Sequence, residues 1–261
     1  MRARRVSFFL LVMAFLLGAG LAGGVIAHAQ EPPLRVGVYQ NAPKVHRTVD
    51  GRVTGFFPEI LELIAAAEGW RLEYVDGTWS ECLDRLERGR IDVMVDVGHT
   101  AERAAKYDFN EESVFVNWGE VYTVPGRRVE SFLDLAGLRI AVMKGSVHTD
   151  GPGGIKDFLA RFNVGATFIE VDDYDQVFAL LAAKQADAGV VNRLFGSLNG
   201  GLYPVARTSI IFNPSHLRFA FPRGRARNAT LIERIDRHLK AMKADPHSEY
   251  YRIIERNLAG V

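Results

Sequence analysis

Apolar residues recur at strand and helix spacing in short blocks along the first part of the chain. Residues 34–39 alternate between the two faces of an extended chain and predict a β-strand. Residues 58–68 carry apolar side chains on one helical face, with Pro58 suited to the first turn and Gly69 to the C-terminal end. The same analysis predicts strands at 71–75 and 91–96, helices at 79–88 and 100–103, and an extended segment at 107–109.

A second series of the same kind follows. Strands are predicted at 138–143, 167–171 and 188–191, and helices at 155–162 and 174–184. Two extended segments, 114–124 and 216–221, frame this second series, and helices at 231–242 and 248–258 end the chain.

The order β-α-β-α-β, found twice, is typical of open sheets covered by helices and predicts an α/β protein. Ligands of such sheets bind beyond the carboxyl ends of the strands. Two units joined by two extended crossings therefore predict a hinge and a cleft that closes on a small solute.

The N-terminus has the pattern of an export signal. Arg2, Arg4 and Arg5 precede an uncharged apolar stretch, and Ala27-His28-Ala29 matches a signal-peptidase site. We expect residues 1–29 to be a signal peptide; the stretch is also long enough to serve as a retained anchor.

Charge and cysteine content narrow the function classes. The chain has 32 basic and 31 acidic residues, and removal of the three leader arginines leaves 29 against 31. This near balance argues against nucleic-acid binding, which needs a basic surface. Cys82 is the only cysteine, so an intramolecular disulfide is excluded, and we expect Cys82 to be a packed helix residue.

Several segments together carry a resemblance to a known family. They are 34–39, Gly55-Phe-Phe-Pro-Glu-Ile60, 86–92, 137–146 and 186–192, and the most specific is Asp96-Val-Gly-His-Thr-Ala-Glu-Arg-Ala-Ala-Lys-Tyr-Asp-Phe109. Their order and spacing resemble the bacterial extracellular solute-binding proteins of family 3, the amino-acid-binding branch. The resemblance implies a type II periplasmic binding protein fold, with two β/α lobes joined by a two-strand hinge. Lobe 1 would comprise 30–118 and 216–261, and lobe 2 would comprise 119–215.

The resemblance also implies ligand-binding positions in the first lobe. Arg103 matches the arginine that binds a ligand carboxylate, and its planar guanidinium suits a bidentate pair. Thr100 is expected to cap the helix that carries Arg103. Gly98 would offer its backbone N–H. Asp96 is interpreted either as a strand-end turn residue or as the carboxylate that receives a cationic ligand group.

In the second lobe the resemblance points to a turn and to a departure from the family pattern. Gly145, Ser146 and Val147 follow a strand, and free backbone N–H groups there would hold an anionic group. Asn192 stands where the family typically has an aspartate that pairs with the ligand's ammonium group. Either Asp96 supplies that charge, or the ligand is not a standard α-amino acid.

Other candidate residues carry weaker signals. Trp79 lies where the family often contributes a ring to the site, and Tyr39 and Trp118 are further aromatic candidates. His99 and His148 are interpreted as loop histidines rather than catalysts. No metal-ligand spacing appears among the histidines and the single cysteine, so no cofactor or metal is expected.

The sequence thus predicts a periplasmic, non-enzymatic, monomeric binder of a carboxylate-bearing or amino-acid-like solute. Its expected partner is a membrane permease of an ABC-type transporter. Two alternatives stay open at this point: a ligand-sensing module that works with a membrane partner, and a dehydratase of the same fold that would use Asp96 as its acid.

Overall fold

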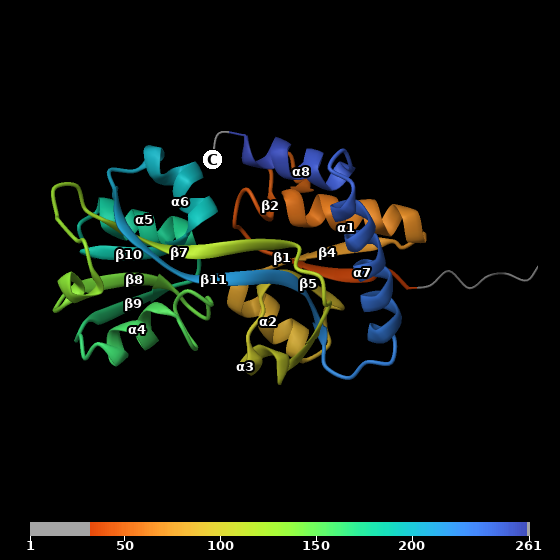
Figure 1. Cartoon of the computed structure of the whole chain (residues 1–261), viewed down its shortest axis with the longest axis horizontal. Helices are drawn as coiled ribbons and strands as arrows, with labels where there is room; N and C mark the ends of the chain where they lie inside the picture. Colours follow the sequence, from red (N-terminus) through yellow and green to blue (C-terminus); the bar gives the residue numbers. More distant parts are fainter. Residues whose placement is uncertain (1–31, 260–261) are drawn as a thin grey trace, which may run out of the picture. The chain divides into compact units, whose positions relative to one another are not determined.

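A computed structural model of the chain describes residues 32–259, which from Pro33 onwards form one compact unit. Its framework is a mixed nine-stranded sheet with helices above and below the strands (Figure 1). The expected signal peptide at 1–29 lies outside the described residues. None of the helices between residues 32 and 259 combines the length and apolar composition needed to cross a membrane.

The sheet has two parallel halves joined by antiparallel strands. Its order is β4-β1-β5-β11-β7-β10-β8-β9, with β6 paired to β11, and a separate hairpin pairs β2 with β3. Strands β1, β4 and β5 are parallel, as are β8, β9 and β10, whereas β11 and β7 run antiparallel to their neighbours. The strands are β1 (Leu34–Val38), β2 (His46–Arg47), β3 (Val53–Thr54), β4 (Leu72–Asp76), β5 (Val93–Gly98), β6 (Tyr107–Phe109), β7 (Phe115–Thr123), β8 (Arg139–Met143), β9 (Thr167–Val171), β10 (Ala188–Asn192) and β11 (Ala206–Pro222).

The helices follow the predicted apolar faces and their capping residues. Helix α1 ends where Gly69 adopts a left-handed conformation, at a φ of 70°, and donates its N–H to Ala65 O. Helix α2 begins with a capping box between Thr78 and Glu81. The helices are α1 (Phe56–Glu68), α2 (Trp79–Glu87), α3 (Ala101–Ala104), α4 (Ile155–Arg161), α5 (Tyr174–Ala182), α6 (Arg193–Asn199), α7 (Asn228–Ala244) and α8 (Glu249–Leu258), with 3₁₀ turns at Phe132–Leu135 and Gly200–Leu202.

The second crossing strand is much longer than the expected 216–221. Strand β11 begins ten residues earlier, and its first part pairs with β7 from Ala206 to Leu217. This part contains Asn213-Pro214, which resembles a turn. Asn213 has a φ of 51°, and the register with β7 shifts between Phe212 and Ser215. The sheet therefore accommodates the irregular residues as a bulge.

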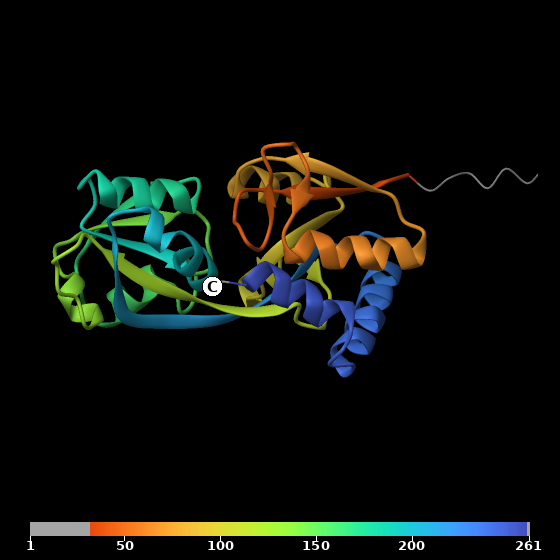
Figure 2. The same cartoon turned by 90° about the horizontal axis from the view of Figure 1, so that it is seen from above.

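Strands β7 and β11 connect the two halves of the sheet, as Figure 2 shows from above. Both strands cross the expected lobe boundaries at 118/119 and 215/216. Because Pro33–Val261 forms one compact unit by its contacts, those boundaries stay a prediction.

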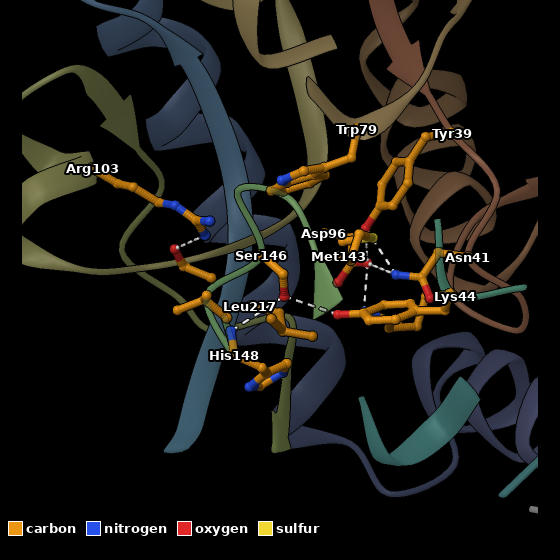
Figure 3. A pocket seen from close by; sticks show the side chains of 13 residues that line it. Tyr39, Asn41, Lys44, Trp79, Asp96, Arg103, Met143, Ser146, His148 and Leu217 are labelled. Carbon is orange, nitrogen blue, oxygen red and sulfur yellow. Dashed lines mark hydrogen bonds and ion pairs between the residues drawn. The ribbon is translucent and has the colours of Figure 1, made fainter. Parts of the chain in front are cut away.

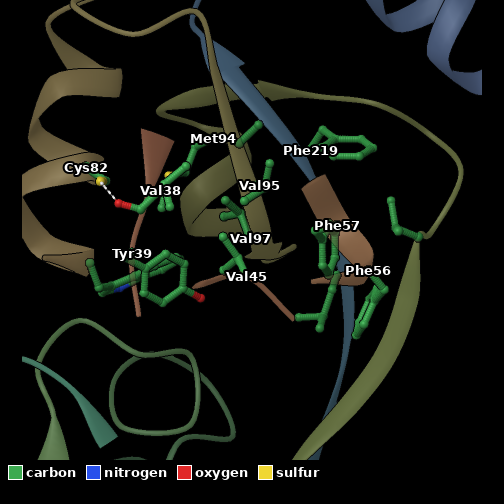
Figure 4. Packing of buried hydrophobic residues seen from close by; sticks show 14 of the residues in the cluster. Val38, Tyr39, Val45, Phe56, Phe57, Cys82, Met94, Val95, Val97 and Phe219 are labelled. Atoms are coloured by element: carbon green, nitrogen blue, oxygen red, sulfur yellow. Dashed lines mark hydrogen bonds between the residues drawn. The ribbon is translucent and has the colours of Figure 1, made fainter. Parts of the chain in front are cut away.

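Two apolar clusters fill the spaces between sheet and helices. The larger one includes the fully buried rings of Phe56, Phe57 and Phe219, which Figure 4 shows packed beside the strands. Burial of one such side chain contributes about 1.5–3 kcal/mol. Cys82 also lies in this cluster, and burial raises the pKa of its thiol to about 11, which makes it an unreactive packed residue as expected. A smaller cluster lies around Ile155 and Leu159 of α4.

Asp236 of α7 holds the turn that leads into β7. Its carboxylate is 6% exposed and accepts hydrogen bonds from Asn110 Nδ2 at 2.9 Å and from the backbone N–H groups of Glu111 and Glu112 at 2.9 and 2.8 Å. Hydrogen bonds to a charged group contribute more than neutral ones, and their loss leaves buried donors unpaired.

We therefore expect Asp236→Ala to lower the free energy of unfolding by about 3 kcal/mol, as measured by urea denaturation. Glu233→Ala on the same helix is the control, because its side chain is 77% exposed, and its effect should stay within about 0.5 kcal/mol. Equal effects of the two substitutions would contradict the role of Asp236.

Candidate functional site

The carboxyl ends of the parallel strands in both halves of the sheet face one small cavity. The loop after β1, the end of β5 and helix α3 meet the loop after β8 and the start of α5 there (Figure 3). The cavity has a volume of about 20 Å³, little more than one water molecule needs. Its lining residues are Tyr39, Asn41, Lys44, Trp79, Asp96, Gly98, Arg103, Met143, Ser146, Val147, His148, Tyr174 and Leu217.

Asp96 is the polar centre of this cavity, and its carboxylate is fully buried. Its Oδ2 atom accepts from the Tyr39 hydroxyl at 2.5 Å and from Asn41 Nδ2 at 3.0 Å, and it pairs with Lys44 Nζ at 2.6 Å (Figure 3). Its Oδ1 atom is also buried and has no hydrogen-bond partner among residues 32–259. One carboxylate oxygen is thus fully used inside the protein, and the other is free.

A bulge in β5 places this carboxylate. Asp96 has a φ of 58°, a left-handed conformation that aspartate tolerates better than most residues. The register between β5 and β11 shifts here, since Met94 pairs with Ala220 and Val97 with Arg218. Such conformations cost about 1–3 kcal/mol and persist where surrounding contacts fix them. The ion pair and two hydrogen bonds on Oδ2 provide those contacts.

Lys44 supplies a cation from the loop that follows β1. The residue is 4% exposed, and the turn that carries it is closed by a bridge between Asn41 and Val45. Burial lowers the pKa of Lys44, while the Asp96 carboxylate opposes that effect. Tyr39 lines the cavity, and burial and the Asp96 charge raise its pKa well above the usual value. Asp96 therefore has an internal countercharge.

Arg103 connects the two sides of the cavity. As predicted, the Thr100 hydroxyl accepts from Arg103 N at 3.1 Å and caps α3. Arg103 Nη1 donates to Gly98 O at 2.9 Å, and Nη2 donates to Gly145 O at 2.8 Å. Its guanidinium lies 5.5 Å from the centre of the Trp79 ring, whose Nε1–H also donates to Gly145 O, at 3.0 Å. Burial lowers the pKa of Arg103, but a guanidinium stays charged in proteins.

The turn at 145–147 uses most of its N–H groups internally. Gly145 N donates to Asp150 Oδ2 at 3.0 Å, and Ser146 N donates to Met143 O at 3.2 Å. Of the three N–H groups expected to hold an anion, only that of Val147 lacks a partner within the described chain. Val147 instead packs closely against the opposite strand, because a Cβ atom on Gly98 would lie 3.0 Å from Val147 Cγ1.

Asn192 lies behind the cavity rather than in its lining. Its Oδ1 accepts from Phe195 N at 3.1 Å, which caps α6, and from Asn117 Nδ2 at 2.9 Å. Its Nδ2 donates to Asn41 Oδ1 at 3.0 Å, and Asn41 in turn donates to Asp96. An aspartate could not make this donation. In this structure Asn192 therefore joins the two sides and supports Asp96 indirectly.

The structure brings most of the sequence-predicted site residues together. Seven of them line the cavity: Tyr39, Trp79, Asp96, Gly98, Arg103, Ser146 and Val147. Thr100 and Gly145 line an adjoining hollow of about 190 Å³, which Arg103 also borders. The weaker candidate Trp118 lies on β7 beneath Arg193, at 4.3 Å, outside the cavity lining.

Sequence reasoning missed other lining residues. Lys44 and Asn41 follow β1, so their position after a strand end was a usable signal. Met143 ends β8 and Tyr174 begins α5, where its hydroxyl lies 2.9 Å from Ser146 Oγ. Leu217 comes from the crossing strand β11, whose extended segment 216–221 was predicted, but its place in the cavity lining was not. The region from 32 to 259 contains no group of three or more His, Cys, Asp or Glu residues arranged for a metal.

His148 lines the cavity, whereas His99 packs against Phe109 away from the lining. His148 is 3% exposed, and its Nδ1 is buried without a partner in the described part of the chain. Burial, together with the facing charges of Lys44 and Arg103, lowers its pKa from 6.5 to about 3. The imidazole is therefore neutral at pH 7.

This shift predicts a loss of stability in acid. Below pH 6.5 His148 is protonated in the unfolded chain but stays neutral in the folded one. The free energy of unfolding therefore falls by about 1.4 kcal/mol per pH unit as the pH falls from 6.5 towards 3. Between pH 7 and pH 5 we expect His148→Gln to lose about 2 kcal/mol less unfolding free energy than the wild type. Urea denaturation at both pH values measures this difference; parallel losses would show that His148 is not the group.

Several proteins are similar to this chain. A curated relative from Haemophilus influenzae, named "Probable amino-acid ABC transporter-binding protein", is 26% identical over an alignment of 251 residues that covers 90% of this chain and 92% of the relative. A mutant of ArgBP from T. maritima superposes with a TM-score of 0.75 at 22% identity, over 87% of this chain and 95% of that one. A histidine kinase sensor domain with similarity to periplasmic binding proteins superposes with a TM-score of 0.75 at 21% identity. The match covers 88% of this chain and 97% of that one.

A further solved structure, the ancestral amino acid-binding protein AncCDT-1, a precursor of cyclohexadienyl dehydratase, gives a TM-score of 0.72 at 22% identity, over 87% and 95% of the two chains. These likenesses confirm the predicted α/β fold of type II periplasmic binding proteins. The sequence profile of the family matches residues 34–259, nearly all of the described chain. The chain therefore belongs to the bacterial extracellular solute-binding proteins, family 3.

Proposed function

We propose that the protein binds a small carboxylate-bearing solute between the two halves of its sheet, where the cavity of about 20 Å³ widens to admit it. The observation that carries the proposal is Arg103. Its guanidinium borders the cavity and, within residues 32–259, donates only to backbone carbonyl groups. Three of its five N–H groups therefore remain available for a carboxylate, and the Trp79 ring lies 5.5 Å from the guanidinium.

We assign the protein a role in solute uptake through an ABC-type transporter outside the cytoplasmic membrane. Support comes from the family and from the name of the Haemophilus influenzae relative. The export signal expected at 1–29 and a membrane permease as partner belong to the same proposal. The likeness to a histidine kinase sensor domain supports sensing as the second candidate, and the genes beside this one would separate the two roles.

A dehydratase function receives less support from the site. Asp96 is the acid that the sequence offered for such a reaction. Its Oδ2 accepts two hydrogen bonds and pairs with Lys44, which is the environment of a carboxylate and not of a proton donor. The family and the relative's name indicate a binding protein.

Thermal shift of the mature protein tests the proposal against a panel of amino acids and small carboxylates. A ligand at a hundredfold excess over its Kd stabilises the native state by about 2.7 kcal/mol, or about 5–10 °C in a chain of this size. We expect at least one carboxylate to produce this shift, Arg103→Ala to abolish it, and Arg103→Lys to retain only part of it.

Arg88→Ala is the matched control, because this arginine follows the last residue of α2, its side chain is 60% exposed, and its ion pair within the described residues is with Asp84. It should leave the shift unchanged. A shift in Arg103→Ala as large as in the wild type would remove Arg103 from the site and with it the basis of the proposal.

A further inference from the structure

The charged groups around the cavity do not balance. Lys44 and Arg103 bring two positive charges, and Asp96 brings one negative charge. His148 adds none at neutral pH, because its pKa is lowered to about 3. Asp150, in the same loop as Ser146, is already paired with Lys156 Nζ at 2.8 Å and with Gly145 N. A ligand that balances this cavity carries one net negative charge.

The two carboxylate oxygens of Asp96 differ in whether they still lack a hydrogen-bond partner. Oδ2 is satisfied by Tyr39, Asn41 and Lys44, so the cationic partner of this carboxylate belongs to the protein. Oδ1 is buried and unpartnered within the described residues, so it requires one hydrogen-bond donor. A neutral hydroxyl meets that requirement without adding charge.

We propose that the solute is a 2-hydroxycarboxylate, whose carboxylate binds Arg103 and whose hydroxyl donates to Asp96 Oδ1. This inference rests on the proposed function of the site and names its ligand class. The Lys44 ammonium group, paired with Asp96, takes the place that the ammonium group of an amino-acid ligand would otherwise have as the countercharge of this carboxylate.

Two related ligand classes fit less well. An α-ammonium group on Oδ1 would share one carboxylate with Lys44 Nζ, which lies 2.6 Å from the other oxygen, and two like charges would face each other in a buried site. An amino acid with a neutral side chain would also leave the cavity with one unbalanced positive charge. A 2-oxo acid has the right charge but no donor, so Oδ1 would stay unpaired.

Matched pairs of ligands test this class directly. Alanine and lactate, serine and glycerate, and phenylalanine and 3-phenyllactate differ at the 2-position alone. Pyruvate is the 2-oxo acid that corresponds to alanine and lactate. Because Trp79 borders the cavity, its fluorescence together with calorimetry gives the Kd values. In the best pair we expect the hydroxy acid to bind at least about tenfold more tightly than both the amino acid and the oxo acid.

Substitution of Lys44 tests the cause of the preference. In Lys44→Met, Asp96 loses its countercharge, and the preference should reverse in favour of the amino acid. In the double variant Lys44→Met/Asp96→Asn, the cavity again has one net positive charge from Arg103, and the hydroxy acid should again bind more tightly. Lys240→Met is the control, because this lysine is 60% exposed on α7 and its substitution should leave every preference unchanged.

The outcomes separate this inference from the proposed function. Amino acids that bind the wild type more tightly than their hydroxy counterparts, with loss of binding in Arg103→Ala, would overturn the ligand class and leave the carboxylate site standing. Failure of all carboxylates to bind would overturn both. If Lys44→Met does not fold, the wild-type comparison of matched pairs still decides the ligand class.

Discussion

The buried pair of Lys44 and Asp96 is the interaction on which the rest of the site depends. Loss of one partner of such a pair typically costs about 3–5 kcal/mol, because the remaining charge is left without compensation in a poorly solvated place. The pair fixes the bulge of β5, orients the Tyr39 hydroxyl and, through Asn41, holds the Asn192 amide. The polar contacts around the cavity are thus one connected network, in which each group limits the positions of the next.

Arg103 and Gly145 form the counterpart of this network across the cavity. The carbonyl of Gly145 accepts from both Arg103 and Trp79, which come from the opposite side. A carbonyl oxygen has two lone pairs, so this one group satisfies two donors and connects α2, α3 and the loop after β8. The arrangement presents the guanidinium to the cavity with its orientation already set, which lowers the entropy lost when an anion binds.

Most of the fold was predictable because short-range patterns in the sequence indicate where its helices and strands begin and end. The Gly69 helix end, the Thr100 cap and the strand at 167–171 all follow from short-range pattern and capping chemistry, and the structure confirms them. Helix α6 was not predicted from the sequence. Its N-terminal cap is Asn192, a residue that was interpreted as part of the ligand-binding site. The first part of β11 was missed because Asn213-Pro214 resembles a turn, whereas the pairing with β7 continues on both sides of it.

The site was predictable in part for the same reason. Arg103 and Asp96 lie in a recognisable sequence motif. The role of Lys44 instead depends on a loop that brings its side chain to Asp96, 52 positions later in the sequence, and local sequence patterns do not predict contacts over such a separation. Charge balance in a cavity is a property of the folded chain. It could be counted only once Lys44, Asp96 and Arg103 had been placed around the same space.

Strand β11 has a consequence for how the protein unfolds. Phe219 and Phe221 lie in the larger apolar cluster, Ile210 and Phe212 lie in the smaller one, and Leu217 between them lines the cavity. A single strand that belongs to both cores cannot leave one without weakening the other. Cooperativity of folding therefore extends across both halves of the sheet, and the two halves are expected to melt in one transition and not as independent domains.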